Sequence, residues 1–221
     1  MNSSEASSRL WDRVFERVRR ELGDAPGCHD FAHTLRVLKN AERIAAEEPA
    51  CDPEAVRFGA LLHDVARPEE LASGGKLCHA ALGAKKSRRI LEEEGCEDAA
   101  FVRHVSEIVR THRYRGSLKP ATLEACIVYD ADKLDSLGAF GVARAFHFAG
   151  RIGACLHNTE QEALASESYS SQDSAYREYL VKLRGLPDHL LTDTARKLAA
   201  GRAEFMRMFF DRLNAEQEGL V

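Results

Sequence analysis

The chain has 221 residues, of which 44% are hydrophobic and 30% are charged. This length is sufficient for one domain with its own hydrophobic core, and the composition excludes collagen-like, low-complexity and wholly disordered chains. The formal net charge of -4 gives no bulk electrostatic reason to bind nucleic acid or an anionic membrane. Any contact with phosphate must then come from a local cluster of basic residues.

Six cysteines are spread along the chain without a C-x-x-C pair, and no N-terminal apolar stretch resembles a signal peptide. They are Cys28, Cys51, Cys78, Cys96, Cys126 and Cys155. We therefore expect reduced thiols in a soluble, cytoplasmic protein rather than a disulfide framework. Because no apolar run is long enough to span a bilayer, we expect no membrane segment.

Helical periodicity dominates the sequence. Apolar residues recur every three or four positions over 11–22, 35–45 and 56–65, which is typical of amphipathic helices. Further helices are predicted near 79–94, 98–111, 120–135, 138–149, 174–184 and 188–215, between breaks rich in Gly, Pro or Ser. The polar segment 166–174 predicts a loop. Since long alternating strands are absent, the sequence predicts an all-α bundle.

The pair His63-Asp64 directly follows the apolar run 58–62. Burying an imidazole and a carboxylate at the end of such a helix costs several kcal/mol unless a partner compensates, and a bound cation is one such partner. The alternative is a core histidine that is hydrogen-bonded to the backbone.

A second group of polar residues precedes the apolar stripe at 35–45. Asp30 can cap the helix by accepting a hydrogen bond from the backbone N–H of residue 33, which places His33 in the first turn. His29 lies just outside this helix, and we interpret it as a polar loop residue.

Three carboxylates follow the apolar run 125–129, at Asp130, Asp132 and Asp135. They would repel one another unless cationic charge, from Lys133 or a metal, offsets them. On a helix, Asp132 and Asp135 share a face, whereas Asp130 points elsewhere. The alternative is a solvated helix end with local salt bridges.

Together these elements give the order H…HD…D, which resembles the HD-domain superfamily of metal-dependent phosphohydrolases, an all-α fold. The segments 130–146 (DADKLDSLGAFGVARAF) and 192–210 extend the likeness to small bacterial HD hydrolases that attack nucleotides. The resemblance covers nearly the whole chain. It implies a single HD-type domain over 1–221, with a metal-binding core at about 26–150 and a C-terminal helical extension at about 170–215.

The resemblance also implies that His33, His63, Asp64 and Asp132 ligate one divalent metal. A mixed set of imidazoles and carboxylates suits Mn, Fe, Co, Ni or Zn, and Mg stays open as well. Four protein ligands around an octahedral ion leave two positions for water and a phosphate oxygen. Such an ion activates water for hydrolysis of a phosphoester or phosphoanhydride.

His79 and His112 match positions at which dinuclear HD enzymes carry additional histidines. Either residue could bind a second metal. Because the first set already satisfies one metal, we expect both to contact the substrate phosphate or to donate a proton to the leaving group. The structural alternative is a hydrogen-bonded surface histidine.

The remaining site candidates surround this set. We expect Lys133 to meet a phosphate or hold Asp132, and we assign it with Asp64, His79 and His112 to catalysis. The candidates for substrate binding are Arg113, Arg144 and Asp135.

Two charged groups are expected at the surface. Glu69 and Glu70 follow the His-Asp pair, but Arg67-Pro68 interrupts the pattern of related enzymes, so we expect exposure and keep Glu69 as an alternative for orienting water. The basic cluster Lys85, Lys86, Arg88 and Arg89 precedes three glutamates. We interpret this cluster as a solvated helix face with local charge pairs.

The resulting hypothesis is a cytoplasmic, metal-dependent phosphohydrolase acting on a nucleotide, such as a nucleoside triphosphate, or on another small phosphoester. It needs no nucleic acid or membrane partner, and a homodimer is left open. One alternative is an HD-fold di-iron oxygenase, which would need two irons and therefore His79 and His112 as ligands. The other is a nucleotide sensor that binds without turnover.

Overall fold

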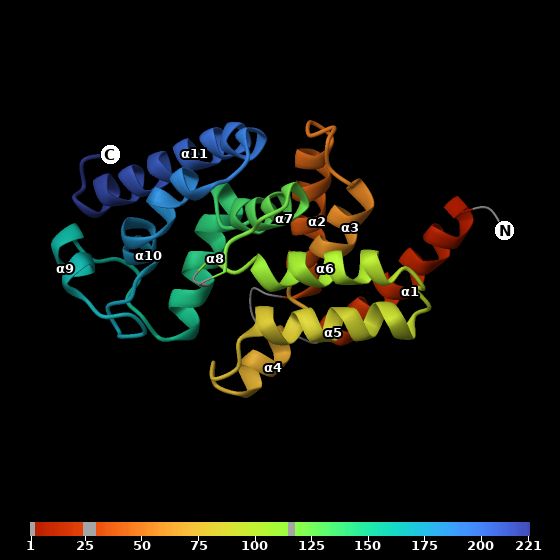
Figure 1. Ribbon diagram of the computed structural model, residues 1–221. Coiled ribbons are helices and arrows are strands. Elements are labelled where there is room, and N and C mark those ends of the chain that lie inside the picture. Colours follow the sequence, from red (N-terminus) through yellow and green to blue (C-terminus); the bar gives the residue numbers. More distant parts are fainter. Residues whose placement is uncertain (1–2, 24–29, 115–117) are drawn as a thin grey trace. The chain divides into compact units, whose positions relative to one another are not determined.

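The structure is a computed structural model, and it describes residues 3–23, 30–114 and 118–221 (Figure 1). The described residues form helices joined by turns and loops and contain no strand, which confirms the predicted all-α class. In chain order the elements are α1 (Ser3–Leu22), α2 (Phe31–Ala45), α3 (Pro53–Leu62), α4 (Arg67–Ala72), α5 (His79–Glu93), α6 (Ala99–Thr111), α7 (Leu123–Leu134), α8 (Gly138–Arg151), α9 (Glu160–Ala165), α10 (Ala175–Val181), the 3-10 helix η1 (Leu183–His189) and α11 (Asp193–Gln217).

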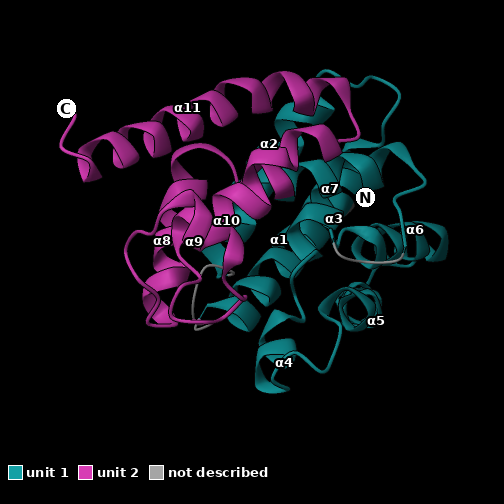
Figure 2. Cartoon of the chain, turned by 90° about the vertical axis from the view of Figure 1, so that its left-hand side faces the viewer, with its two compact units in different colours: residues 1–132 teal, residues 133–221 magenta. Residues whose placement is uncertain are grey.

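The chain forms two compact units, residues 1–132 and residues 133–221 (Figure 2). In the first unit, α5 packs along α6 and α2 packs along α3, while α1 contacts both pairs. In the second unit, α11 packs on α8, and α10 contacts α8, α9 and η1. The predicted organisation as one HD-type domain with an extension remains a prediction.

The core of the first unit comes from the apolar stripes of α1, α3, α5 and α6. Its buried members are Val14, Val18, Leu22, Phe58, Leu61, Leu62, Val65, Ile90, Leu91, Val102, Val105 and Val109. Each such side chain contributes about 1.5–3 kcal/mol by leaving water. The end of α3, where the His-Asp pair follows, is therefore anchored in this apolar core.

Side-chain caps fix where several helices begin. Asp52 accepts hydrogen bonds from the backbone N–H groups of residues 54 and 55, directly before Pro53 at the start of α3. Asp98 caps α6 in the same way, and Thr192 caps α11. These caps satisfy amide groups that have no partner within the helix. They place the polar residues at helix ends, where the candidate site residues also lie.

Three short elements were not predicted, namely α4, α9 and η1. With six or seven residues each, they are too short to produce helical periodicity. The predicted helix 174–184 is also too long, because α10 ends at Val181 and the 3-10 helix η1 follows. Pro187, inside η1, has no backbone N–H to donate. The loop predicted at 166–174 is confirmed.

Two further expectations concern thiols and membranes. Five cysteines are free, and Cys28, like His29, lies outside the described residues. Among the helices that the structure describes, none carries an apolar stretch of the length that a bilayer crossing requires.

Candidate metal centre

His33 lies in the first turn of α2, as predicted. The carboxylate of Asp30 accepts a hydrogen bond of 2.9 Å from the backbone N–H of His33 and so caps the helix. The His33 side chain is completely buried. The cap therefore holds an imidazole at a defined point of the interior.

His63 and Asp64 follow the last residue of α3, and both are buried. The Nδ1 atom of His63 lies 2.7 Å from the carbonyl oxygen of Ala60, so Nδ1–H donates to this carbonyl. The Nε2 atom then carries the lone pair. The hydrogen bond that a core histidine would make is present, and it directs the other ring nitrogen toward Asp64.

His79 is the first residue of α5, and His112 follows the last residue of α6. Both are buried, with exposures of 2% and 1%, so neither is a surface histidine. The Nδ1–H group of His112 donates to the carbonyl oxygen of Val109 at 2.7 Å. The histidines that follow α3 and α6 thus make the same hydrogen bond, from Nδ1–H to the carbonyl oxygen three residues earlier.

The Nε2 atoms of four histidines converge on the carboxylate of Asp64. The distances to Oδ2 are 3.7 Å from both His33 and His63. The distances to Oδ1 are 3.4 Å from His79 and 3.5 Å from His112. These side chains form two groups that could hold a metal ion, and Asp64 belongs to both groups. We call His33, His63 and Asp64 the first set, and Asp64, His79 and His112 the second set.

Asp132 adjoins the first set. Its Oδ1 atom lies 3.4 Å from the Nε2 atom of His33, and 19% of its side chain is exposed. A hydrogen bond of 3.1 Å from the side-chain amide of Asn40 to the carbonyl oxygen of Ala131 fixes this part of α7 beside α2. The structure thus brings together all four residues predicted to hold one metal.

Burial keeps two of these histidines, His63 and His79, neutral at pH 7. Burial lowers the pKa of His63 to about 3, although the nearby charges of Asp64 and Asp132 act in the opposite direction. Burial likewise lowers the pKa of His79 to about 4. Neutral imidazole is the form that ligates a metal.

The donor chemistry fits a divalent cation. The Nε2 atoms of His33 and His63 are 3.3 Å apart, and those of His79 and His112 are 3.2 Å apart. Where the Nδ1–H group of a ring donates a hydrogen bond, Nε2 of the same ring presents its lone pair toward an oxygen of Asp64. A cation at such a point replaces repulsion between electron pairs with attraction. Imidazole and carboxylate together suit a first-row transition metal.

Glu70 is buried, which contradicts the predicted surface position. Its Oε2 atom lies 2.9 Å from Nδ1 of His79 and also forms an ion pair with Arg67. Burial alone would raise the pKa of Glu70, but the contacts with His79 and Arg67 lower it below its ordinary value. The sequence reasoning missed Arg67 and Glu70 as site residues. Arg67 lies three residues after Asp64, and Glu70 lies three residues after Arg67. Residues at this spacing are neighbours on a helix, and this could have indicated that they interact.

The basic cluster on α5 is also only partly as predicted. Arg88 pairs with Glu92 at the surface, as expected. Lys86, in contrast, is buried, and its Nζ atom lies 2.7 Å from Glu21 and 2.6 Å from Glu69. Glu69 therefore pairs with Lys86, with 38% of its side chain exposed.

The remaining candidates divide between the two units. Arg113 stands beside the second set, since its guanidinium lies 3.7 Å from Glu70 and 3.2 Å from the Cys78 sulfur. In the second unit, Lys133 and Asp135 are buried, and Asp135 forms an ion pair of 2.8 Å with Arg144. The substrate roles expected for Lys133, Asp135 and Arg144 remain predictions.

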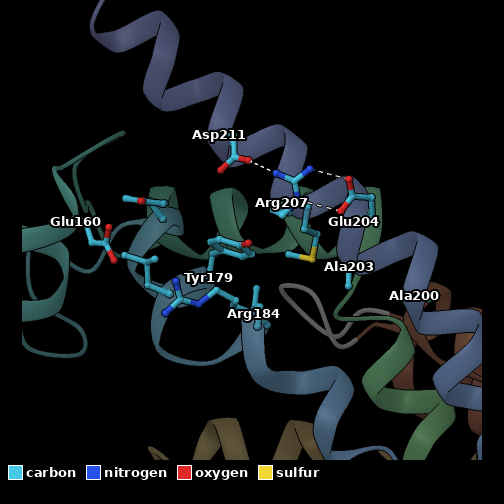
Figure 3. A pocket seen from close by; sticks show the side chains of 12 residues that line it. Glu160, Tyr179, Arg184, Ala200, Ala203, Glu204, Arg207 and Asp211 are labelled. Carbon is cyan, nitrogen blue, oxygen red and sulfur yellow. Dashed lines mark hydrogen bonds and ion pairs between the residues drawn. The ribbon is translucent and has the colours of Figure 1, made fainter.

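The second unit has a pocket of about 500 Å³. Figure 3 shows Tyr179 in this pocket between the side chains of Arg184 and Arg207, and Arg207 is held by Glu204 and Asp211. None of the residues that line this pocket is a predicted metal or substrate residue. The candidate metal centre is therefore the histidine cluster of the first unit.

Known proteins resemble this chain in sequence and in structure. The HD domain family model matches residues 30–137. YpgQ of Bacillus subtilis is 35% identical over 206 residues, which cover 92% of this chain and 91% of that protein. The crystal structure of YpgQ in complex with ADP has a TM-score of 0.71 and 30% identity, over 95% of this chain and 96% of that chain.

A predicted HD superfamily hydrolase from an uncultured Thermotogales bacterium is a second structural relative. Its crystal structure has a TM-score of 0.67 and 31% identity, over 98% of this chain and 99% of that chain. This likeness to HD hydrolases and the His/Asp groups of the first unit support a metal-dependent hydrolase. Because the identity to this HD superfamily hydrolase extends over nearly the whole of both chains and the HD model matches the segment that carries the histidine cluster, this chain belongs to the HD-domain superfamily.

Proposed function

We propose that this chain is a metal-dependent phosphohydrolase that acts on a nucleotide, as a nucleoside triphosphate pyrophosphohydrolase or a phosphatase. The observation that carries the proposal is the convergence of four buried histidine Nε2 atoms on the two oxygens of Asp64. A nucleotide is favoured because the relative YpgQ has been crystallised in complex with ADP.

In this proposal His33, His63, Asp64 and Asp132 hold one divalent cation. When bound, such a cation acts as a Lewis acid that activates water and offsets the charge of the phosphate group. Asp64, His79 and His112 form a second position that differs from the proton-donating role expected from the sequence. Nδ1–H of His112 donates to a carbonyl oxygen, and Nδ1 of His79 lies 2.9 Å from the carboxylate of Glu70. With the proton of each ring on Nδ1, both Nε2 atoms carry a lone pair, so this geometry favours ligation.

Arg113 is the basic group that the first unit offers to the substrate. It is partly exposed, at 37% of its side chain, and stands beside the second set through its contacts with Glu70 and Cys78. A guanidinium donates two parallel hydrogen bonds to phosphate oxygens, which suits this role. Lys133, Asp135 and Arg144 are kept as further substrate contacts on the strength of the sequence alone.

The proposal is tested with metal-free protein reloaded with Mn²⁺ or Ni²⁺. We expect release of phosphate or pyrophosphate from one or more members of a panel of nucleoside triphosphates, diphosphates and generic phosphoesters. Asp64→Ala should abolish this release, because it removes the carboxylate that both sets share. Inactivity of the wild-type protein over the whole panel would contradict the proposal.

A second candidate function is oxygenation by a di-iron centre. The observation that favours it is the second set, since a di-iron site needs His79 and His112 as ligands. Elemental analysis separates the two functions. Two irons per chain with a ferric absorption band would support oxygenation, whereas non-iron metal with phosphate release would support hydrolysis.

A further inference from the structure

Glu70 contacts both a histidine of the candidate metal centre, His79, and the proposed phosphate-binding residue, Arg113. Its side chain is almost entirely buried, with 9% exposed. One oxygen, Oε2, contacts Nδ1 of His79 at 2.9 Å and the guanidinium of Arg67. The other, Oε1, faces the backbone N–H of His79 at 3.5 Å and the guanidinium of Arg113 at 3.7 Å.

The imidazole of His79 has two possible hydrogen-bond arrangements at Nδ1. Glu70 can accept a proton held by Nδ1, or Arg67, whose Nη1 atom is 3.0 Å away, can donate to an unprotonated Nδ1. The first arrangement leaves a lone pair on Nε2. The second places the proton on Nε2, where it points toward Asp64 and excludes a metal.

Glu70 decides between these arrangements. An ionised carboxylate accepts hydrogen bonds and cannot donate one, so its contact with Nδ1 requires the proton to be there. Arg67 remains satisfied, because its guanidinium also forms ion pairs with Glu70 and, at 3.4 Å, with Asp64. We infer that Glu70 is a positioning residue that fixes the metal-binding tautomer of His79 and holds Arg113 beside it.

This inference deepens the proposed function and rests on it for the role of Arg113. A structural ion pair alone would explain the burial of Glu70 beside Arg67, but it would not determine which nitrogen of His79 carries the proton. The tautomer, the metal affinity of the second set and the KM of the substrate are therefore the informative readouts.

The test compares Glu70→Ala and Glu70→Gln with a matched control, Glu124→Gln. Glu124 is also a largely buried carboxylate beside a histidine, with 12% of its side chain exposed and His104 at 3.3 Å. The alanine variant removes the acceptor, whereas the glutamine variant keeps an acceptor without charge and should be intermediate. Circular dichroism and thermal melts identify the variants that fold.

Two measurements are made on metal-free protein. Nitrogen-15 NMR of the histidine rings should show the proton of His79 on Nδ1 in the wild type and on Nε2 in Glu70→Ala. Calorimetric titration with Mn²⁺ should show two binding events in the wild type. In Glu70→Ala the second event should weaken about 10- to 100-fold, the usual effect of losing an outer partner of a metal ligand. The first event, and both events in Glu124→Gln, should be unchanged.

A double-mutant cycle shows whether Glu70 acts through His79. Adding Glu70→Ala to His79→Ala should cause no further loss of metal affinity. In turnover assays, Glu70→Gln should raise the KM of the nucleotide, because the group that faces Arg113 loses its negative charge. An unchanged tautomer with two unchanged Mn²⁺ affinities in both Glu70 variants would overturn the inference. A wild-type protein that binds two Mn²⁺ but hydrolyses nothing would instead overturn the proposed function alone.

Discussion

The Nε2 atoms of His33 and His63 lie 3.3 Å apart, although both rings are completely buried. His63 is held by its contact with the carbonyl of Ala60, and His33 by the cap at the start of α2. The His63 ring cannot turn away without breaking its hydrogen bond to Ala60, and the cap fixes the backbone that carries the His33 ring. The first unit therefore presents preorganised nitrogen donors, a property that a metal site requires.

Replacing Asp132 tests the composition of the first position. Asp132→Ala should weaken Mn²⁺ binding at the first set and leave the second set unchanged, because Asp132 lies 3.4 Å from His33. Calorimetric titration measures both affinities. An unchanged first affinity in this variant would remove Asp132 from the ligand set predicted from the sequence.

The pair of Glu21 and Lys86 predicts a loss of stability in acid. Burial alone would raise the pKa of Glu21, but hydrogen bonds from Lys86 and Arg17 lower it below its ordinary value of 4.5. The folded state thus binds this proton less readily than the unfolded state. The stabilisation is present above pH 4.5 and is lost as the pH falls through the lowered pKa.

Thermal melts between pH 7 and pH 3 check this prediction. Glu21→Gln should be less stable than the wild type at pH 7 by about 1–2 kcal/mol, a value reduced from that of a fully buried pair because Glu21 is partly exposed. The difference should shrink toward pH 3. Glu107→Gln, which removes an exposed partner of Arg110, serves as the control and should change the melting temperature little. A constant difference across the pH range would contradict the account.

Gly59 is required by the close approach of α3 to α6. A Cβ atom at this position would lie 2.6 Å from the Cγ2 atom of Ile108, well inside contact distance. Gly59→Ala should therefore destabilise the protein by about 1–3 kcal/mol, the typical cost of overpacking. Gly150→Ala is the matched control on α8, because a Cβ atom there meets open space. It should be neutral or stabilise by up to about 1 kcal/mol. Chemical denaturation compares the two variants, and equal stabilities would contradict this packing argument.

The helices and the first set of donors follow from local features of the sequence. Asp30 before an apolar stripe predicted a cap, and the cap places His33. The long amphipathic segments predicted the large helices because burial of one face recurs at a fixed period. These features depend only on neighbours in the chain.

The features that were missed depend on contacts between distant segments. Glu70 is buried because His79 and Arg67 meet it after α4 and α5 have packed, and α4 has only six residues from which to judge a face. Lys86 adjoins Lys85 in a charged run, and this suggested a solvated face. It nevertheless lies on the buried side of α5 with Ile90, because Glu21 of α1 and Glu69 of α4 offset its charge there.

The two proposed metal positions share the carboxylate of Asp64. Calorimetric titration of metal-free wild type and Asp64→Asn with Mn²⁺ tests this sharing, with Asp188→Asn, which lies outside the cluster in η1, as the control. We expect two equivalents of bound Mn²⁺ in the wild type and in the control. In Asp64→Asn both binding events should be strongly weakened together. Retention of either event at wild-type affinity in Asp64→Asn would contradict the claim.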